Sequence, residues 1–351
     1  MMDWLFEFGL FFAKVATFVI AFGVLIVIIA KARGGSTARQ HLRIRDRQEY
    51  YRQYREQLEA AQQEKSARQQ FKKARAKADK KALKSARKAH KQDKKAPATP
   101  TLWVLDFNGD IRASREPSFS QEITALLPLL KKGDEVVVRL ESGGGLVHAY
   151  GLAASQIERL KQGGARLSVC VDKVAASGGY MMACCADHVV AAPFAVIGSI
   201  GVVAQVPNFH RFLKKNDVDV EVLTAGRHKR TLTLLGENTE EGRQKFLEDL
   251  KSTHQLFKSH VSARRPGLDI EQVADGEIWY GQQALDKGLI DQVTTSDEYI
   301  ESKSASFKVL EVTLVEKQSP LSRLGGRVQS LVERGVDARI KQVMEQEWQR
   351  Y

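Results

Sequence analysis

Short apolar runs rich in β-branched residues alternate with helical patterns along the chain after Pro100, and this alternation limits the fold more than any other feature. The apolar runs occupy residues 102–107, 135–140, 166–171, 188–192 and 220–224. The helical patterns occupy residues 119–127, 146–160, 209–215 and 240–261. Strands that alternate with helices predict an α/β fold with a largely parallel sheet.

Three of the predicted strands lead into loops rich in glycine and serine. The strand at 135–140 continues as ESGGGLVHAYGLA, the strand at 166–171 as DKVAASGGYMMA, and the strand at 188–192 leads to VIGSIGVV. Parallel sheets bind their ligands at the carboxyl ends of the strands. We therefore expect a functional site where these three loops meet.

The first loop carries Gly143, Gly144 and Gly145 just before a predicted helix. Glycines leave the backbone free to turn sharply, and unpaired N–H groups at a helix start can stabilise a developing oxyanion. A phosphate site or an acyl-CoA site would have a similar sequence. The loop predicts an anion-binding backbone without identifying the anion.

Ser177 stands in the second loop, between two alanines and two glycines. Serine is a common N-cap, so it could simply cap the helix that begins at Gly178. It could also be a nucleophile on a tight turn, where the glycines allow a substrate to approach closely. The loop alone supports both interpretations equally.

A nucleophilic serine needs a general base, and the sequence offers histidines and lysines. His148 lies in the glycine loop, His188 follows Asp187, and Lys173 precedes Ser177 by four residues. Lys229 lies in the stretch AGRHKRTLT, and a neutral lysine amine can accept the proton of a serine. A basic surface turn would explain the same stretch.

The three cysteines are Cys170, Cys184 and Cys185. An odd count with two adjacent members does not form a disulfide framework and is typical of a reduced compartment or of small buried side chains. No CxxC pair or His/Cys ligand spacing is present, so the sequence predicts no metal site.

The amino-terminal region contains an apolar run at residues 10–30, with Lys14 as its one charge. About 20 apolar residues suffice to cross a bilayer. A cleaved signal peptide is the alternative, but Asp3 and Glu7 precede the run where a signal peptide would carry basic residues. Basic residues follow the run, which favours a cytoplasmic location for the rest of the chain.

Residues 31–96 carry 22 Lys and Arg against 7 Asp and Glu, a net charge of +15, whereas the whole chain carries +12. The basic character therefore belongs to this segment alone. Its composition predicts a solvated helical or disordered spacer that could lie against anionic lipid headgroups. No aromatic stacking motif is present, so we expect no specific nucleic acid.

The stretches ASGGYMMACCAD, GSIGVV and AGRHKR follow one another in this order, and together they resemble the S49 serine peptidases, the family of signal peptide peptidase A. The resemblance covers essentially the full chain. It implies a Clp-protease/crotonase-like α/β domain and a Ser/Lys dyad. It also implies a bacterial inner-membrane protein and a homo-oligomeric ring, in which some relatives complete the dyad across a protomer boundary.

Matched residue by residue, the resemblance makes Ser177 the nucleophile and Lys229, 52 residues later, the general base. Ser199 would orient the lysine amine, and the amides of Gly144 and Gly178 would form the oxyanion hole. The usual SPGG of the family is replaced here by Ser-Gly-Gly-Gly at residues 142–145. Losing that proline should loosen the oxyanion loop, which substrate or a neighbouring chain would then have to order.

We therefore expect a transmembrane anchor at 1–32, a basic spacer at 33–100, a catalytic domain at 101–304 and a carboxyl-terminal extension at 305–351. The expected activity is that of a membrane-anchored serine endopeptidase that cleaves peptides or membrane-associated proteins without a cofactor or metal. Analogy with signal peptide peptidase A favours a periplasmic catalytic domain, against the charge bias. Two alternatives remain: a crotonase-type acyl-CoA enzyme, and a scaffold without catalytic activity that binds lipid or RNA through the basic segment.

Overall fold

The computed structural model describes residues 40–64, 67–92 and 99–316, together with four helical residues near the amino terminus, Phe11, Lys14, Val15 and Thr17. The rest of the predicted membrane-spanning run 10–30 lies outside the described residues, as does the carboxyl-terminal region after residue 316. Among the residues described, no helix has both the length and the apolar character that a membrane crossing requires. Residues 43–313 form the larger of the two units into which the chain divides.

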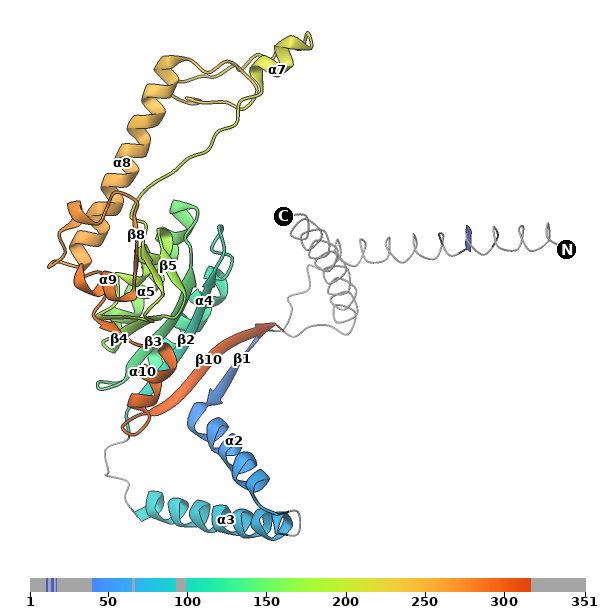
Figure 1. The fold of residues 1–351 in the computed structure, drawn as a ribbon, viewed down its shortest axis with the longest axis vertical. Helices are drawn as coiled ribbons and strands as arrows, with labels where there is room; N and C mark the ends of the chain where they lie inside the picture. The colour runs from blue at the N-terminus through green and yellow to red at the C-terminus, as the bar shows by residue number, and fades with distance from the viewer. Residues whose placement is uncertain are drawn as a thin grey trace, which may run out of the picture. The chain divides into compact units, whose positions relative to one another are not determined.

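The larger unit is built on a sheet whose strands follow the order β1-β10-β2-β3-β4-β6-β9 (Figure 1). The central strands are β2 (Thr101–Gly109), β3 (Glu135–Ser142), β4 (Arg166–Val171) and β6 (His188–Ala191). The outer strands are β1 (Gln40–Asp46), β9 (Gln292–Val293) and β10 (Lys308–Glu316). From β10 to β9 all neighbours pair in parallel, which confirms the predicted α/β class.

Three short strands branch from the carboxyl end of β3. They are β5 (Val174–Ala176), β7 (Val196–Gly198) and β8 (Ile278–Tyr280). Ser142 at the end of β3 pairs with Ala175, β5 pairs with β7 in parallel, and β7 pairs with β8 antiparallel. The branch therefore brings the glycine loop that follows β3 and the turn that follows β5 to one place.

Helices cover both faces of the sheet. The helices of this unit are α2 (Arg47–Gln62), α3 (Arg68–Gln92), α4 (Glu116–Leu126), α5 (Val147–Gln162), α6 (Gly178–Ala183), α7 (His210–Lys215), α8 (Glu240–Arg264), α9 (Gly281–Asp286) and α10 (Ser296–Lys303). Helices α4, α5 and α6 contribute Ile123, Ile157 and Tyr180 to the main core, and α10 contributes Ile300 to a second core. Burial on both faces explains the continuous apolar runs of β3 and β4.

The predicted strand at 220–224 is wrong, since this stretch has no regular secondary structure. It belongs to an irregular segment at 201–239, which contains α7. The segment is fastened to itself by hydrogen bonds from Phe209 N–H to Leu234 O (2.7 Å) and from Asn208 Nδ2 to Thr233 O (2.9 Å). A β-branched run forms a strand only where a partner strand is available, and this run has none in the described chain.

The sheet also takes in strand β1 from the predicted spacer (33–100) and strand β10 from the predicted carboxyl-terminal extension (305–351), neither of which the sequence indicated. Arg47 at the start of α2 is 6% exposed. Its guanidinium bonds Glu311 at 2.9 Å and also pairs with Asp297. The beginning of the basic segment is therefore packed against the folded domain, and helices α2 and α3 occupy the remainder that is described.

Glu135 at the start of β3 provides a test of this packing. Its buried carboxylate accepts hydrogen bonds from Tyr299 (2.6 Å), Ser168 (2.8 Å) and Lys303 (3.1 Å). Burial raises the pKa of Glu135, but the three hydrogen bonds outweigh burial and hold the pKa below its ordinary value of 4.5. The stability that this carboxylate contributes is therefore complete above its ordinary pKa, and it is lost as the pH falls through the lower folded-state pKa.

We expect Glu135→Gln to lower the free energy of unfolding at neutral pH by about 2 kcal/mol, because Lys303 loses its partner. The free energy of unfolding of the variant should also fall less steeply in acid than that of the wild type. Denaturant titrations at neutral pH and at about pH 4 measure both effects. The exposed Glu248→Gln is the control. Equal acid dependence in the Glu135 variant and the wild type would contradict this account.

Candidate active site

A cavity of about 820 Å³ opens where the strand-end loops meet α8. Four of the five predicted site residues line it, namely Ser177, Ser199, Gly144 and Gly178. Residues 253–260 of α8 contribute part of the opposite wall, including His254 and His260. The structure therefore gathers the three predicted loops around one space.

Ser177 occupies the sharp turn between β5 and α6. Its backbone has φ 52° and ψ −119°, a conformation that residues other than glycine rarely adopt. The turn is held by hydrogen bonds from Ser177 N–H to Gly198 O (2.8 Å) and from Met181 N–H to Ser177 O (2.9 Å). The side chain makes no capping hydrogen bond to α6, so the N-cap interpretation does not hold. Strain of this kind is typical of functional turns.

Gly144 and Gly178 lie against Ser177. A Cβ added to Gly144 would stand 2.6 Å from the nitrogen of Gly178 and 2.8 Å from the Cβ of Ser177. Gly144 has φ +87°, a conformation that favours glycine however much room a side chain would have. Gly178 begins α6, and the first N–H groups of a helix have no acceptor within the helix. The amide of Gly178 therefore lies next to the serine, and the backbone of Gly144 packs against both.

A hydrogen-bonded chain that the sequence did not reveal fastens the glycine loop. Gly144 N–H donates to Ser142 Oγ (3.1 Å), which lies 2.5 Å from Tyr150 Oη, and Tyr150 Oη donates to Asp110 O (2.7 Å). Since the tyrosine proton goes to the carbonyl, Ser142 Oγ donates to Tyr150 and accepts from Gly144. The loop is thus anchored without the proline of the usual family motif.

The glycine loop offers a matched pair of substitutions. We expect Gly144→Ala to lower peptidase kcat by about 100-fold or more, because the added methyl group would occupy the space beside the Gly178 amide. Gly143→Ala should stay within about threefold of wild type, since no atom lies within 4 Å of a Cβ added there. Steady-state kinetics on both variants, with circular dichroism as a check on folding, measures the difference. Equal losses would show that Gly144 has no special position.

Ser199 directly follows β7, with φ 50° and a hydrogen bond from its N–H to Glu277 O (2.6 Å). Like Ser177, it is a non-glycine residue held in a left-handed conformation, and it lines the same cavity. The two strained serines therefore stand at the ends of the neighbouring strands β5 and β7.

Lys229 lies apart from the four predicted site residues of its own chain that line the cavity. It is exposed and absent from the cavity wall. Arg227, two residues earlier, bonds Glu241 in the first turn of α8 (2.8 Å), whereas the contribution of α8 to the cavity begins at Thr253. The 12 residues of α8 from Glu241 to Thr253 span about 18 Å along the helix. This distance is longer than a lysine side chain. Figure 1 shows the segment around α7 at the beginning of α8, away from the sheet.

The other candidate bases do not line the cavity. Lys173 pairs with Glu141 at 3.0 Å, His148 is exposed in the first turn of α5, and His188 bonds Gln292 (3.2 Å) at the start of β6. The histidines that do line the cavity are His254 and His260, which the sequence did not single out.

Each of the two cavity histidines places Nε2 against a backbone carbonyl, of Ile200 (3.2 Å) for His254 and of Met181 (2.9 Å) for His260. A carbonyl oxygen can only accept a hydrogen bond, so both Nε2 atoms are donors and cannot take a proton from Ser177.

Comparison with known proteins gives consistent matches. A model described as "Peptidase family S49 N-terminal" matches residues 3–157, and "Peptidase family S49" matches residues 159–310. "Probable protease SohB" of Haemophilus influenzae is 59% identical over 224 residues, 64% of either chain. Its namesake in Buchnera aphidicola subsp. Acyrthosiphon pisum is 53% identical over 227 residues, 65% of this chain and 68% of that one.

More distant matches carry related names. A "Putative signal peptide peptidase SppA" of Enterococcus faecium is 27% identical over 184 residues, 52% of this chain and 53% of that one. The solved structure of a membrane-bound stomatin-specific protease is 15% identical, with a TM-score of 0.37, and covers 59% of this chain and 86% of its own. The match to the SohB protein of Haemophilus influenzae spans 64% of the length of that relative.

Proposed function

The chain belongs to peptidase family S49, and from this we propose that it is a membrane-anchored serine endopeptidase with Ser177 as nucleophile and Lys229 as general base. The observation that carries the proposal is the strained turn at Ser177, with the Gly178 amide next to it and the backbone of Gly144 packed against both. A serine whose side chain makes no capping hydrogen bond, next to the amide at a helix start, has an arrangement suited to acyl transfer.

In the proposed reaction, Ser177 Oγ attacks the carbonyl carbon of the scissile peptide bond, and the hydroxyl proton passes to the neutral amine of Lys229. The amide of Gly178 stabilises the oxyanion, and the amide of Gly144 joins it once it releases Ser142 Oγ, to which it donates in the structure. The lysine then gives the proton to the leaving amine, which leaves an ester on Ser177. Water, deprotonated by the same lysine, hydrolyses the ester. Ser199 orients the lysine amine, and every step proceeds without a cofactor.

Because Lys229 is exposed and does not line the cavity that holds Ser177 in the same chain, we propose that a neighbouring copy supplies it. The irregular segment that carries Lys229 exposes several apolar side chains, including Val203 (85%) and Leu223 (88%). Leu234 and Leu235 are also exposed. Apolar groups gathered on one exposed segment typically mark a contact with another protein. We therefore propose a homo-oligomeric ring in which this segment reaches the cavity of the next chain.

Membrane attachment in this proposal rests on the apolar run 10–30, and the basic residues that follow it would lie near anionic headgroups. The family model of the S49 amino-terminal region matches from residue 3, so the apolar run 10–30 lies within the part of the chain that this model covers.

An acyl-CoA enzyme of the crotonase type would use a similar glycine loop but no nucleophilic serine. Labelling with a fluorophosphonate probe separates the two functions. We expect covalent label on Ser177 in the wild type and in Ser155→Ala, an exposed serine on α5, and none in Ser177→Ala. Absence of label from the folded wild type, or label on another residue, would overturn the proposal.

A further inference from the structure

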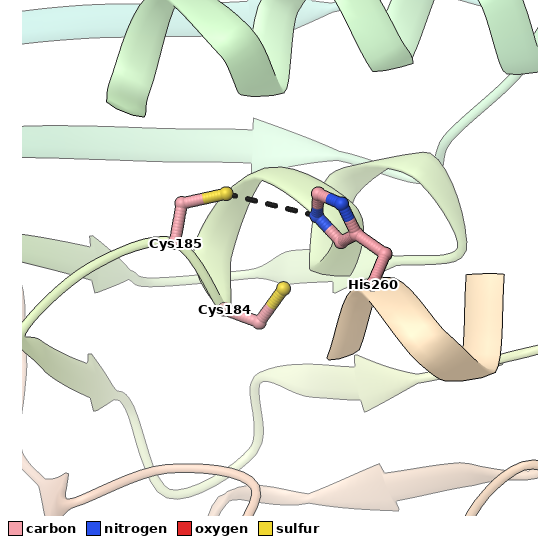
Figure 2. A group of neighbouring side chains, drawn as sticks. All are labelled: Cys184, Cys185 and His260. Atoms are coloured by element: carbon pink, nitrogen blue, oxygen red, sulfur yellow. Dashed lines mark hydrogen bonds between the residues drawn. The ribbon is translucent and has the colours of Figure 1, made fainter. Parts of the chain in front are cut away.

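Three side chains with metal-binding atoms converge behind the active-site cavity. Cys184 and Cys185 directly follow α6, and His260 reaches them from α8 (Figure 2). The two sulfurs and a ring nitrogen of His260 all lie within 4.8 Å of one another. Cys185 Sγ is 3.7 Å from His260 Nε2, and the two cysteines are 0% and 1% exposed. Residues 75 positions apart thus present three donor atoms to one point.

The geometry points to a binding site for one thiophilic divalent cation, and we propose Zn²⁺ as its ligand. Two thiolates and one imidazole are donors that Zn²⁺ prefers, with distances of about 2.0–2.3 Å to the metal. The three donor atoms lie within 4.8 Å of one another, so one ion between them is in reach of all three. No sequence spacing indicated the site, because His260 meets the cysteine pair only through the packing of α8 on α6.

The carbonyl of Met181 supplies a further oxygen at the centre of the cluster. It accepts hydrogen bonds from His260 Nε2 (2.9 Å), Cys184 Sγ (3.4 Å) and Cys185 Sγ (3.4 Å). Binding of the cation would replace these three hydrogen bonds with metal–ligand bonds. The two thiols lose their protons to the solvent as the bonds form, and His260 gives up its Nε2 proton while Nδ1 takes one from the solvent, so the imidazole stays neutral and no oxidant or reductant is needed.

The charges around the cluster are compatible with a divalent cation. The cationic groups beside it, Arg264 and Arg265, are already paired with Glu158 and Asp291. Two thiolates neutralise the two charges of the ion, so the buried site would carry no net charge. This satisfies the requirement that buried charges be compensated.

The cluster also has an entry path. His260 and Met181 line the active-site cavity, so an ion that enters the cavity reaches the imidazole directly. Burial of a small thiol explains a cysteine such as Cys170, which lies in β4 within the second core. Cys184 and Cys185 differ from it because a histidine ring nitrogen lies within 4.8 Å of both sulfurs. Cys170 is therefore the natural control.

The test uses the full-length protein, reduced and freed of metal by a chelator, and titrates it with Cd²⁺ as a spectroscopic substitute for Zn²⁺. We expect a thiolate-to-metal charge-transfer absorption that saturates at one ion per chain and is displaced by Zn²⁺. Cys184→Ala, Cys185→Ala and His260→Ala should each weaken binding by at least about tenfold, whereas Cys170→Ala should bind as the wild type does. Zn²⁺ should also raise the unfolding temperature of the wild type.

The wild-type titration keeps the proposal falsifiable even if a variant does not fold. Absence of the charge-transfer band from the wild type would overturn the site. The same would follow if the band persisted in the Cys184→Ala/Cys185→Ala double variant or disappeared in Cys170→Ala. These results are independent of peptidase activity, so they would leave the proposed function unaffected.

Discussion

Ser177→Ala is expected to lower peptidase turnover by on the order of 10⁶-fold, the loss that follows removal of a catalytic nucleophile. The variant has no other group that could form the acyl-enzyme at this turn. The fold should survive, because the hydrogen bonds that hold the turn join the backbone of Ser177 to Gly198 and Met181. The side chain itself makes no capping bond that could be lost.

Hydrolysis of a fluorogenic peptide by wild type, Ser177→Ala and Ser155→Ala measures this effect. Ser155 is an exposed serine whose hydroxyl bonds only the backbone of its own helix at Gly151, so its variant should keep full activity. A Ser177→Ala protein with activity within about tenfold of wild type would exclude Ser177 as the nucleophile.

Lys229→Ala should produce the second-largest effect, a loss on the order of 10⁴-fold, because the base is needed to form and to hydrolyse the acyl-enzyme. Arg230→Ala is the control, since it removes the neighbouring positive charge from the same exposed stretch. If AGRHKR were only a basic surface turn, the two substitutions would have similar small effects. A selective loss at Lys229 would identify the amine rather than the charge as the important group.

The sequence predicted the frame of the fold because burial on both faces makes the central strands continuous apolar runs. Strands β3, β4 and β6 and helices α4, α5 and α8 lie where the patterns indicated them. Strands β5 and β7 have three residues each, which is too short for an alternating pattern to be recognised in the sequence. Strand β1 lies in a strongly basic segment, and such a composition predicts a solvated spacer. It gave no indication that Arg47 would pack against Glu311.

Local sequence also predicted that the glycine-rich loops after the strands would meet, and the family resemblance identified Ser177, Ser199, Gly144 and Gly178 within them, all of which line one cavity. It could not indicate Tyr150, which reaches the loop from the inner face of α5. Nor could it indicate His260, which is brought to Cys185 only by the packing of α8. Such contacts depend on tertiary structure rather than on spacing along the chain.

The central claim is that one chain contributes Ser177 and another contributes Lys229, and mixing two inactive variants tests it most directly. Ser177→Ala retains the lysine, and Lys229→Ala retains the serine. When equal amounts are unfolded, mixed and reassembled, about a quarter of the sites in a closed ring should combine an intact serine with an intact lysine from the neighbour. We predict recovery of about that fraction of wild-type activity, whereas each variant reassembled alone stays inactive. A mixed oligomer that contains both variants, confirmed by differently tagged chains, and that remains inactive would contradict the claim.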